Sequence, residues 1–180
     1  LIRCLINVDN EDVVGMEEHW IDIHDPAILS LRVTNFRNYK CGMAAEGKSP
    51  FCLEYNCFEE EKIWNASDEE IYDLAIKDLK GMRLLKDIKK YDFKVVRFPK
   101  AYPLYYKGYE PHVEAIKEKL LIHKNIHTIG RAGMYKWNNM HHSIKTGILA
   151  ARNVSDEKHD LWNVKGLVAL GKDYNNDDDT

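Results

Sequence analysis

The sequence predicts an α+β fold, in which a largely antiparallel sheet is flanked by helices. Short stretches before residue 58 alternate apolar and polar residues, which is typical of strands with one covered face. Two longer segments, 68–82 and 109–123, place apolar residues at the spacing of an amphipathic helix. A strand–turn–helix pattern at 126–151 follows them. With 180 residues, 44% of them hydrophobic, the chain is long enough to bury a core.

The expected strands are runs of alternating, β-branched or aromatic residues that turn residues interrupt. They cover residues 1–7, 19–24, 29–40, 51–58 and 93–98. An acidic turn at 9–12 follows the first strand, and Asp25-Pro26 ends the second. Two glycines and a proline within 41–50 indicate a loop.

Helix start signals are clearest at 68–82. Ser67 is the expected N-cap, and Glu70 stands three residues later, as in a capping box. The expected apolar face consists of Ile71, Leu74, Ala75 and Leu79. A short helical turn is expected over 84–90. In the helix at 109–123, four residues are expected to point inward: Val113, Ile116, Leu120 and Leu121.

The segment 126–151 has the strongest functional signal. We expect a β-branched strand at 126–129, a turn with Gly130 and Gly133, and a helix from Asn139. The helix carries an apolar stripe of Met140, Ile144, Ile148 and Ala151. Its N-terminus, beside the turn, suits an anion or a polarised carbonyl. Polar and aromatic residues crowd positions 131–142, which favours a functional loop over a simple connection.

Composition narrows the class of protein. The net charge is −3 without a basic cluster, so we expect no nucleic-acid partner, and no apolar run is long enough to span a membrane. The four cysteines form no C-x-x-C pair, so we expect no metal site and a cytoplasmic protein. The acidic tail 173–180 is expected to be disordered. The oligomeric state does not follow from the sequence.

The stretch GRAGMYKWNNMHHSIKTG, residues 130–147, resembles the C-terminal signature of FAD-dependent amine-oxidase-like flavoproteins. The nearest branch holds the UDP-galactopyranose mutases and lipopolysaccharide-biosynthesis oxidoreductases. Its pattern is G-R-x-G-x-F/Y-x-Y/W-x-N-M-D-H-S-x-x-T/S-G, and His141 replaces the family's Asp. The resemblance implies FAD as cofactor and a set of cofactor-binding residues: Gly130, Arg131, Asn139, Met140, His142 and Ser143. It also implies that Trp137 binds substrate.

Two further segments resemble the same family. HWIDIHDPAILSLRVTNFRNYK (19–40) matches a segment on the substrate side of the flavin, which implies substrate contacts by Arg32, Asn38 and Tyr39. PKAYPLYY (99–106) matches an aromatic segment that lines the active site, which implies roles for Tyr102 and Tyr105. A half-exposed arginine on a sheet and aromatic packing between domains explain these residues equally well, so both interpretations stay open.

The dinucleotide fingerprint G-x-G-x-x-G is missing, and the family carries it at the far N-terminus. The chain also begins without Met, so we expect the C-terminal part of a longer protein. Residues 1–106 would form the substrate-binding domain, and 107–172 would contribute to the FAD site. The expected function is FAD-dependent oxidation of a small molecule such as a sugar nucleotide or cell-surface polysaccharide precursor. The alternatives are a mutase-type isomerisation and a non-catalytic domain that binds an anionic sugar or a partner protein. No residue is singled out as catalytic.

Overall fold

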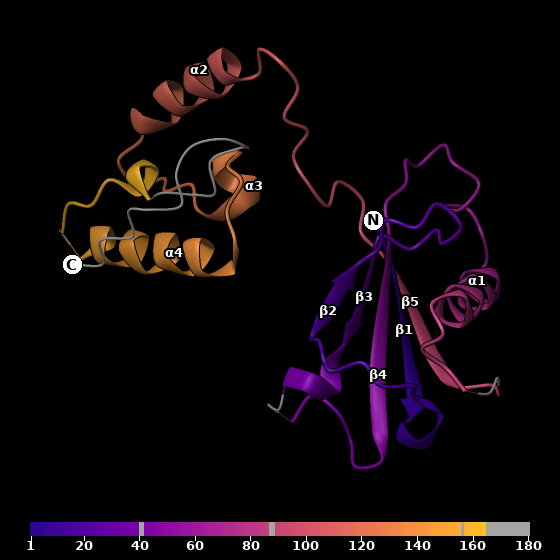
Figure 1. Cartoon of the computed structure of the whole chain (residues 1–180). Helices are drawn as coiled ribbons and strands as arrows, with labels where there is room; N and C mark the ends of the chain where they lie inside the picture. The colour runs from indigo at the N-terminus through magenta and orange to yellow at the C-terminus, as the bar shows by residue number, and fades with distance from the viewer. Residues whose placement is uncertain (40–41, 87–88, 156, 165–180) are drawn as a thin grey trace. The chain divides into compact units, whose positions relative to one another are not determined.

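The computed structural model describes residues 1–39, 42–86, 89–155 and 157–164. The chain divides into two compact units, Leu1–Ala101 and Tyr102–Thr180 (Figure 1). Each unit is described separately below.

The first unit is a five-stranded antiparallel sheet in the order β2-β3-β4-β1-β5. The strands are β1 (Ile2–Asp9), β2 (Trp20–Asp22), β3 (Arg32–Asn35), β4 (Lys48–Tyr55) and β5 (Asp92–Arg97). β1 lies between β4 and β5 and pairs with both. The predicted α+β class is confirmed.

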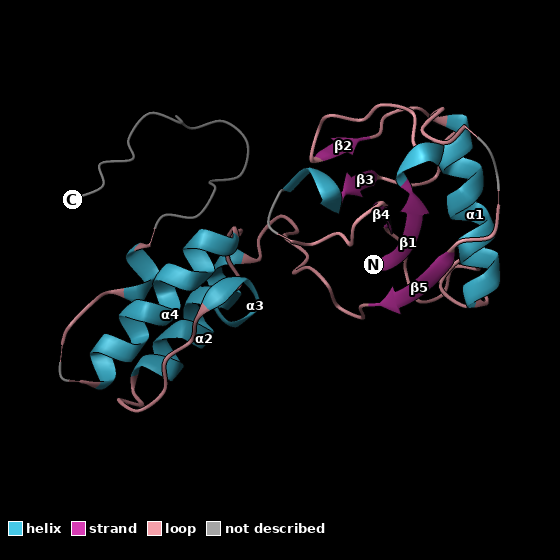
Figure 2. Ribbon diagram, turned by 90° about the horizontal axis from the view of Figure 1, so that it is seen from below, coloured by secondary structure: helices cyan, strands magenta, loops and turns pink. Residues whose placement is uncertain are grey.

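One face of this sheet carries the core of the first unit. Ile2, Cys4, Ile6 and Val8 alternate along β1 and are buried. Helix α1 (Asp68–Gly81) packs against β1 and β5 (Figure 2). Its buried face includes the predicted Ile71, Ala75 and Leu79, and Leu74 is partly buried. The predicted capping box is also present, because the Glu70 N–H donates to Ser67 Oγ over 3.2 Å and Ser67 N–H donates to Glu70 Oε2 over 2.7 Å.

Three predicted elements of the first unit differ in the structure. β3 ends at Asn35 because the 3₁₀ helix η2 (Phe36–Tyr39) follows it, where the sequence predicted a strand to residue 40. β4 begins at Lys48, inside the predicted loop, and ends at Tyr55. Residues 84–86 form no helical turn, because Leu85 pairs with Val13 as an antiparallel bridge; residues 87–88 lie outside the described part of the chain.

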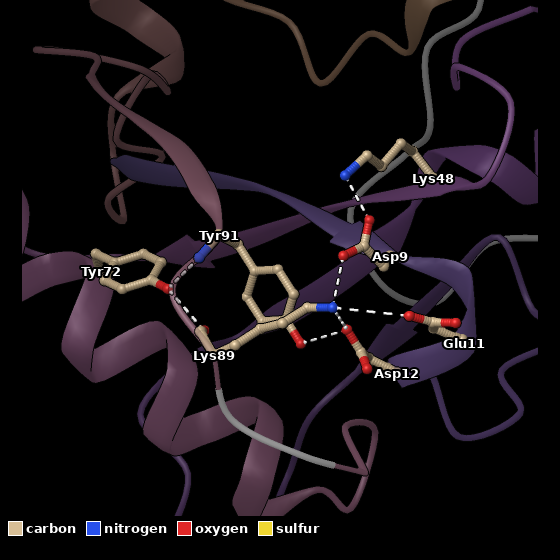
Figure 3. Close-up of polar contacts among 7 residues, drawn as sticks. All are labelled: Asp9, Glu11, Asp12, Lys48, Tyr72, Lys89 and Tyr91. Carbon is tan, nitrogen blue, oxygen red and sulfur yellow. Dashed lines mark hydrogen bonds and ion pairs between the residues drawn. The ribbon is translucent and has the colours of Figure 1, made fainter.

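A network of ion pairs joins the end of β1 to the segment that precedes β5 (Figure 3). Lys89 Nζ lies 2.7 Å from Asp9 Oδ2 and 2.8 Å from Asp12 Oδ2. Asp9 also pairs with Lys48, and the Tyr91 hydroxyl donates to Asp12 Oδ2 over 3.0 Å. Hydrogen bonds from these lysines lower the pKa of both aspartates. Burial and the bond to Asp12 raise the pKa of Tyr91 to about 12.

The second unit is helical. It contains α2 (Glu110–Leu121), α3 (Gly130–Met134), α4 (Met140–Val154) and the 3₁₀ helix η3 (Leu161–Asn163). Its core is small: Met134, Ala150 and Leu161 are buried together, with Leu149 and Trp162 partly buried against them. No described helix is long and apolar enough to cross a membrane.

Several predictions for the second unit are wrong in detail. Residues 126–129 form no strand, since no described strand pairs with them. Gly133 lies inside the short helix α3, not in a turn. On α2, Ile116 and Leu121 are exposed (59% and 61%) although we predicted that they point inward. η3 is the last described element, and the tail 173–180, which was predicted to be disordered, lies outside the described residues.

Candidate functional site

The connection into α3 depends on Gly130. Ile129 is extended, and Gly130 follows with a φ of 70°, a conformation that side chains rarely adopt. The Gly130 N–H donates to the hydroxyl of Thr146 over 3.1 Å, and this hydroxyl donates to the Ser143 carbonyl over 2.9 Å. Thr146 is fully buried. Gly130 is thereby fixed beside the first turn of α4.

The N-terminus of α4 is formed as predicted. Asn139 is the N-cap residue in an extended conformation, and its N–H donates to His142 Nδ1 over 3.1 Å. The His141 and His142 rings lie 3.8 Å apart between centroids. Met140, the first helical residue, is 80% exposed. A polar helix start beside a left-handed glycine, with an exposed thioether at its edge, offers both backbone dipoles and apolar surface to a ligand.

Arg131 lies among aromatic rings in the second unit. Its guanidinium carbon is 4.9 Å from the Tyr102 ring centre and 5.4 Å from that of Trp137. Its Nε donates to the Asn138 carbonyl over 2.9 Å, which fixes the side chain. Tyr102 and Trp137 are 41% and 47% exposed, so the two rings present accessible surface beside a cation.

Tyr105 is the centre of this aromatic cluster. Its ring lies 5.3 Å from Tyr109, 5.3 Å from Tyr135 and 5.5 Å from Trp137. Tyr135 adopts a left-handed conformation (φ 49°), and its hydroxyl donates to the Leu104 carbonyl over 2.6 Å. The structure therefore brings the predicted Tyr102, Tyr105, Arg131 and Trp137 together. The sequence prediction missed Tyr109 and Tyr135 as members of the cluster, because ring contacts between separate segments follow from the fold.

Two buried polar groups of this region have no hydrogen-bond partner among the described residues. They are the Tyr105 hydroxyl and the side-chain amide of Asn138. Burial raises the pKa of Tyr105, and the nearby Arg131 charge opposes that rise. An unpaired buried polar group costs about 1–3 kcal/mol. Asn138 is 2% exposed and was not among the predicted site residues. Its position within the polar run 131–142 was the one sequence feature that indicated a place in the site.

In the first unit, Arg32 lies on β3 beside β2. Its Nε pairs with Asp22 Oδ1 at 2.6 Å, and its guanidinium carbon lies 5.9 Å from the Trp20 ring centre. The hydrogen bond from Arg32 lowers the pKa of Asp22. The Arg32 side chain is 38% exposed and Trp20 is 50% exposed, so the ion pair and the indole ring are both accessible to solvent.

Asn38 and Tyr39 lie in η2, next in the chain after β3. Asn38 Nδ2 donates to the carbonyls of Met16 (2.7 Å) and Glu18 (2.8 Å), so the amide holds the segment before β2 in place. The Tyr39 ring packs edge-on against His19 at 4.7 Å and is 38% exposed. These contacts give Asn38 a structural role in the first unit, while Tyr39 keeps accessible surface.

The class that these elements define is an α+β fold with an open antiparallel sheet. It matches a solved structure, the crystal structure of reduced UDP-galactopyranose mutase, with a TM-score of 0.68 and 21% sequence identity. The match covers 91% of this chain and 35% of the mutase chain, so the chain spans about a third of that protein's length. At this identity the likeness establishes the fold. Neither the protein-family models nor the curated proteins gave a match.

Proposed function

We propose that this chain is the C-terminal part of an FAD-dependent oxidoreductase. In this proposal the second unit forms one side of the flavin site, and the first unit binds substrate. The observation that carries it is the N-terminus of α4 beside Gly130, with Met140 exposed next to it. A flavin has a flat apolar ring and a polar edge that gains negative charge on reduction. A helix N-terminus stabilises such charge, and a protein tunes flavin chemistry in this way.

Exposed apolar residues of the second unit support the proposal that a further domain packs against it. Met140, Ile144 and Ile148 repeat along one stripe of α4 and are 80%, 57% and 50% exposed. Ile129, in the segment predicted to be a strand, is also exposed. Exposed apolar residues in such a stripe mark an interaction site. We infer that a further part of the polypeptide, with the dinucleotide-binding fold, covers the apolar stripe of α4.

Residue roles within the proposal follow the sequence predictions. Gly130, Arg131, Asn139, Met140, His142 and Ser143 would contact FAD. Arg32, Tyr39, Tyr102, Tyr105 and Trp137 would contact a small-molecule substrate such as a sugar nucleotide. Asn38, also predicted as a substrate contact, uses its amide hydrogens on the Met16 and Glu18 carbonyls and would hold this segment in place. A guanidinium binds phosphate or carboxylate in a bidentate manner, and rings beside it suit a sugar or a base. The proposed location is the cytoplasm, which fits the free thiols of Cys4, Cys52 and Cys57.

A mutase-type isomerisation is the second candidate, because the matched structure is a reduced mutase. The two reactions differ in redox balance. An oxidoreductase transfers electrons from substrate to flavin, so substrate bleaches the oxidised flavin under anaerobic conditions. A mutase-type reaction has no net electron transfer and requires flavin that is already reduced. Anaerobic mixing of the full-length protein with sugar nucleotides distinguishes these outcomes.

The test of the flavin proposal is an absorption spectrum of the full-length protein and of two variants. Met140→Asp places a carboxylate where the apolar ring would lie, so we expect loss of bound flavin while circular dichroism shows that the protein remains folded. Lys145→Gln, an exposed change on the same helix, shifts the net charge by the same amount and should keep the flavin. A colourless full-length protein that also ignores added FAD would refute the proposal and favour a binding domain. Normal flavin content in Met140→Asp would refute the placement.

A further inference from the structure

A pocket in the second unit is separate from the residues assigned above. It has a volume of about 290 Å³. The second half of α2, residues 123–124 and 126–128, Asn153, and residues 159–162 form its walls. None of the residues proposed to contact FAD or substrate lines it. We call it the α2 end pocket.

The ionisable side chains that line the α2 end pocket are mostly basic. They are Lys117, His123, Lys124, His127 and His159. Asp160 is the acidic residue of the lining, and its Oδ1 accepts the N–H of Trp162 over 2.9 Å. The chain as a whole has a net charge of −3, so this accumulation of basic groups is local.

Two of the basic groups have acidic neighbours. Lys117 Nζ lies 2.8 Å from Glu114 on α2, and His159 Nε2 lies 2.7 Å from Glu157. Within the described residues, Lys124, His123 and His127 form no ion pair. These side chains have no carboxylate partner and can therefore donate hydrogen bonds to an anion that enters the pocket.

Thr128 and Asn153 are polar, and the rest of the lining is apolar. Leu120, Ile126 and Trp162 are among the apolar residues, and Lys117 Nζ lies 5.2 Å from the centre of the Trp162 ring. An aromatic wall next to a lysine accommodates a flat ring that carries negative charge at one end. A bare inorganic anion would leave this apolar wall in contact with water.

Hydrogen bonds hold the wall formed by Asn153 and residues 159–162 in place. Asn153 Nδ2 donates to the His159 carbonyl over 2.9 Å, and the His159 N–H donates to Asn153 Oδ1 over 2.7 Å. Lys136 Nζ donates to the carbonyls of Trp162 (2.7 Å) and Val164 (2.9 Å). The wall is thus fixed by contacts within the chain, which lowers the ordering cost of binding.

We propose that the α2 end pocket binds a small organic phosphate with a flat ring as its body. The phosphate would lie against Lys124 and His127, and the ring would pack on Trp162 and Ile126. A phosphate monoester fits because it carries between one and two negative charges near neutral pH and has several acceptor oxygens. The site is independent of the proposed flavin chemistry, since it uses other residues.

Calorimetric titration of the full chain with phenyl phosphate tests this proposal. We expect binding, with inorganic phosphate, phenol and glucose 1-phosphate each roughly tenfold weaker or more, because each lacks the ring or the phosphate. Lys124→Glu combined with His127→Glu should weaken phenyl phosphate binding at least about tenfold, since two donors are replaced by carboxylates that repel the phosphate. Lys119→Glu, on the exposed side of α2 and outside the pocket, should leave it unchanged.

Absence of phenyl phosphate binding would overturn the proposal. So would equally tight binding of inorganic phosphate or glucose 1-phosphate, or an equal loss in Lys119→Glu, which would indicate general charge attraction. If circular dichroism shows that the double variant is unfolded, Lys124→Gln gives the same comparison with a milder change. Flavin content can be measured on the same samples, so failure of this proposal is distinguishable from failure of the flavin proposal.

Discussion

Asp78 connects three parts of the first unit, and its removal should have a large effect on stability. The carboxylate lies on α1 and is 2% exposed. Its Oδ2 accepts the Ser30 N–H at 2.9 Å and the Tyr55 hydroxyl at 3.1 Å, and its Oδ1 lies 3.4 Å from the Leu29 N. Burial and the neighbouring Asp78 raise the pKa of Tyr55. One side chain therefore holds α1, the segment before β3, and β4 together.

The substitution Asp78→Ala removes both short hydrogen bonds and leaves two donors buried. A hydrogen bond to a charged group contributes about 1.5–3 kcal/mol, so we expect a loss of roughly 3–5 kcal/mol in the free energy of unfolding. Amide hydrogen exchange in β1 and β4 of the full chain measures this quantity for the first unit specifically. Exchange there should accelerate by more than about a hundredfold.

Two further variants separate this explanation from a general effect on the helix. Asp73→Ala, an exposed position on the same helix, should change stability by less than about 0.5 kcal/mol. Tyr55→Phe should cost about 1–2 kcal/mol alone and much less in the Asp78→Ala background, because its partner is already missing. A loss below about 1 kcal/mol in Asp78→Ala, or additive effects in the double variant, would refute the reasoning.

Three other predictions concern charge and buried polarity. Asp9 and Asp12 have lowered pKa values in the folded chain. Their contribution to the free energy of unfolding is therefore present above the ordinary pKa near 3.8 and is lost as the pH falls through the lower folded values. When unfolding is measured as a function of pH, Asp12→Asn should show less destabilisation by acid than the parent chain. Asn138→Leu removes an amide that has no hydrogen-bond partner among the described residues, so the melting temperature should stay constant or rise, and a clear decrease would reveal a partner. In the proposed full-length flavoenzyme, Arg32→Ala should raise KM for an anionic substrate roughly tenfold without loss of flavin, whereas Asp22→Asn should not. Unchanged kinetics, or equal changes in both variants, would remove Arg32 from the substrate site.

Local patterns predicted the first unit well because its elements carry local signals. The alternation in β1 places one apolar face on the core, and the Ser67 capping box marks the start of α1. The end of β3 was predicted too late, although the alternation in LSLRVTNFRNYK breaks at Asn35 and Phe36, where the chain turns into η2. The bridge between Val13 and Leu85 joins distant segments, and no local pattern indicates it.

The second unit was harder to predict because its apolar residues lack partners within the described chain. A β-branched run at 126–129 has the composition of a strand, but a strand forms only where another strand accepts its hydrogen bonds. The inward face predicted for α2 fails at Ile116 for a similar reason, since helical periodicity identifies an apolar face but not what covers it. The start of α4 at Asn139 was predictable because an N-cap is a local feature.

The pairing of β1 has a consequence for the order of events during synthesis. β1 is the first strand of the unit, yet its partners on either side are β4 and β5, so Ile2 pairs with Tyr55 and with Arg97. β1 therefore stays unpaired until β4 has been made, and one of its edges stays open until the chain has been made as far as β5. Such non-local pairing slows folding and leaves apolar strand residues exposed in the meantime. We expect a growing chain that ends before β5 to depend on chaperones.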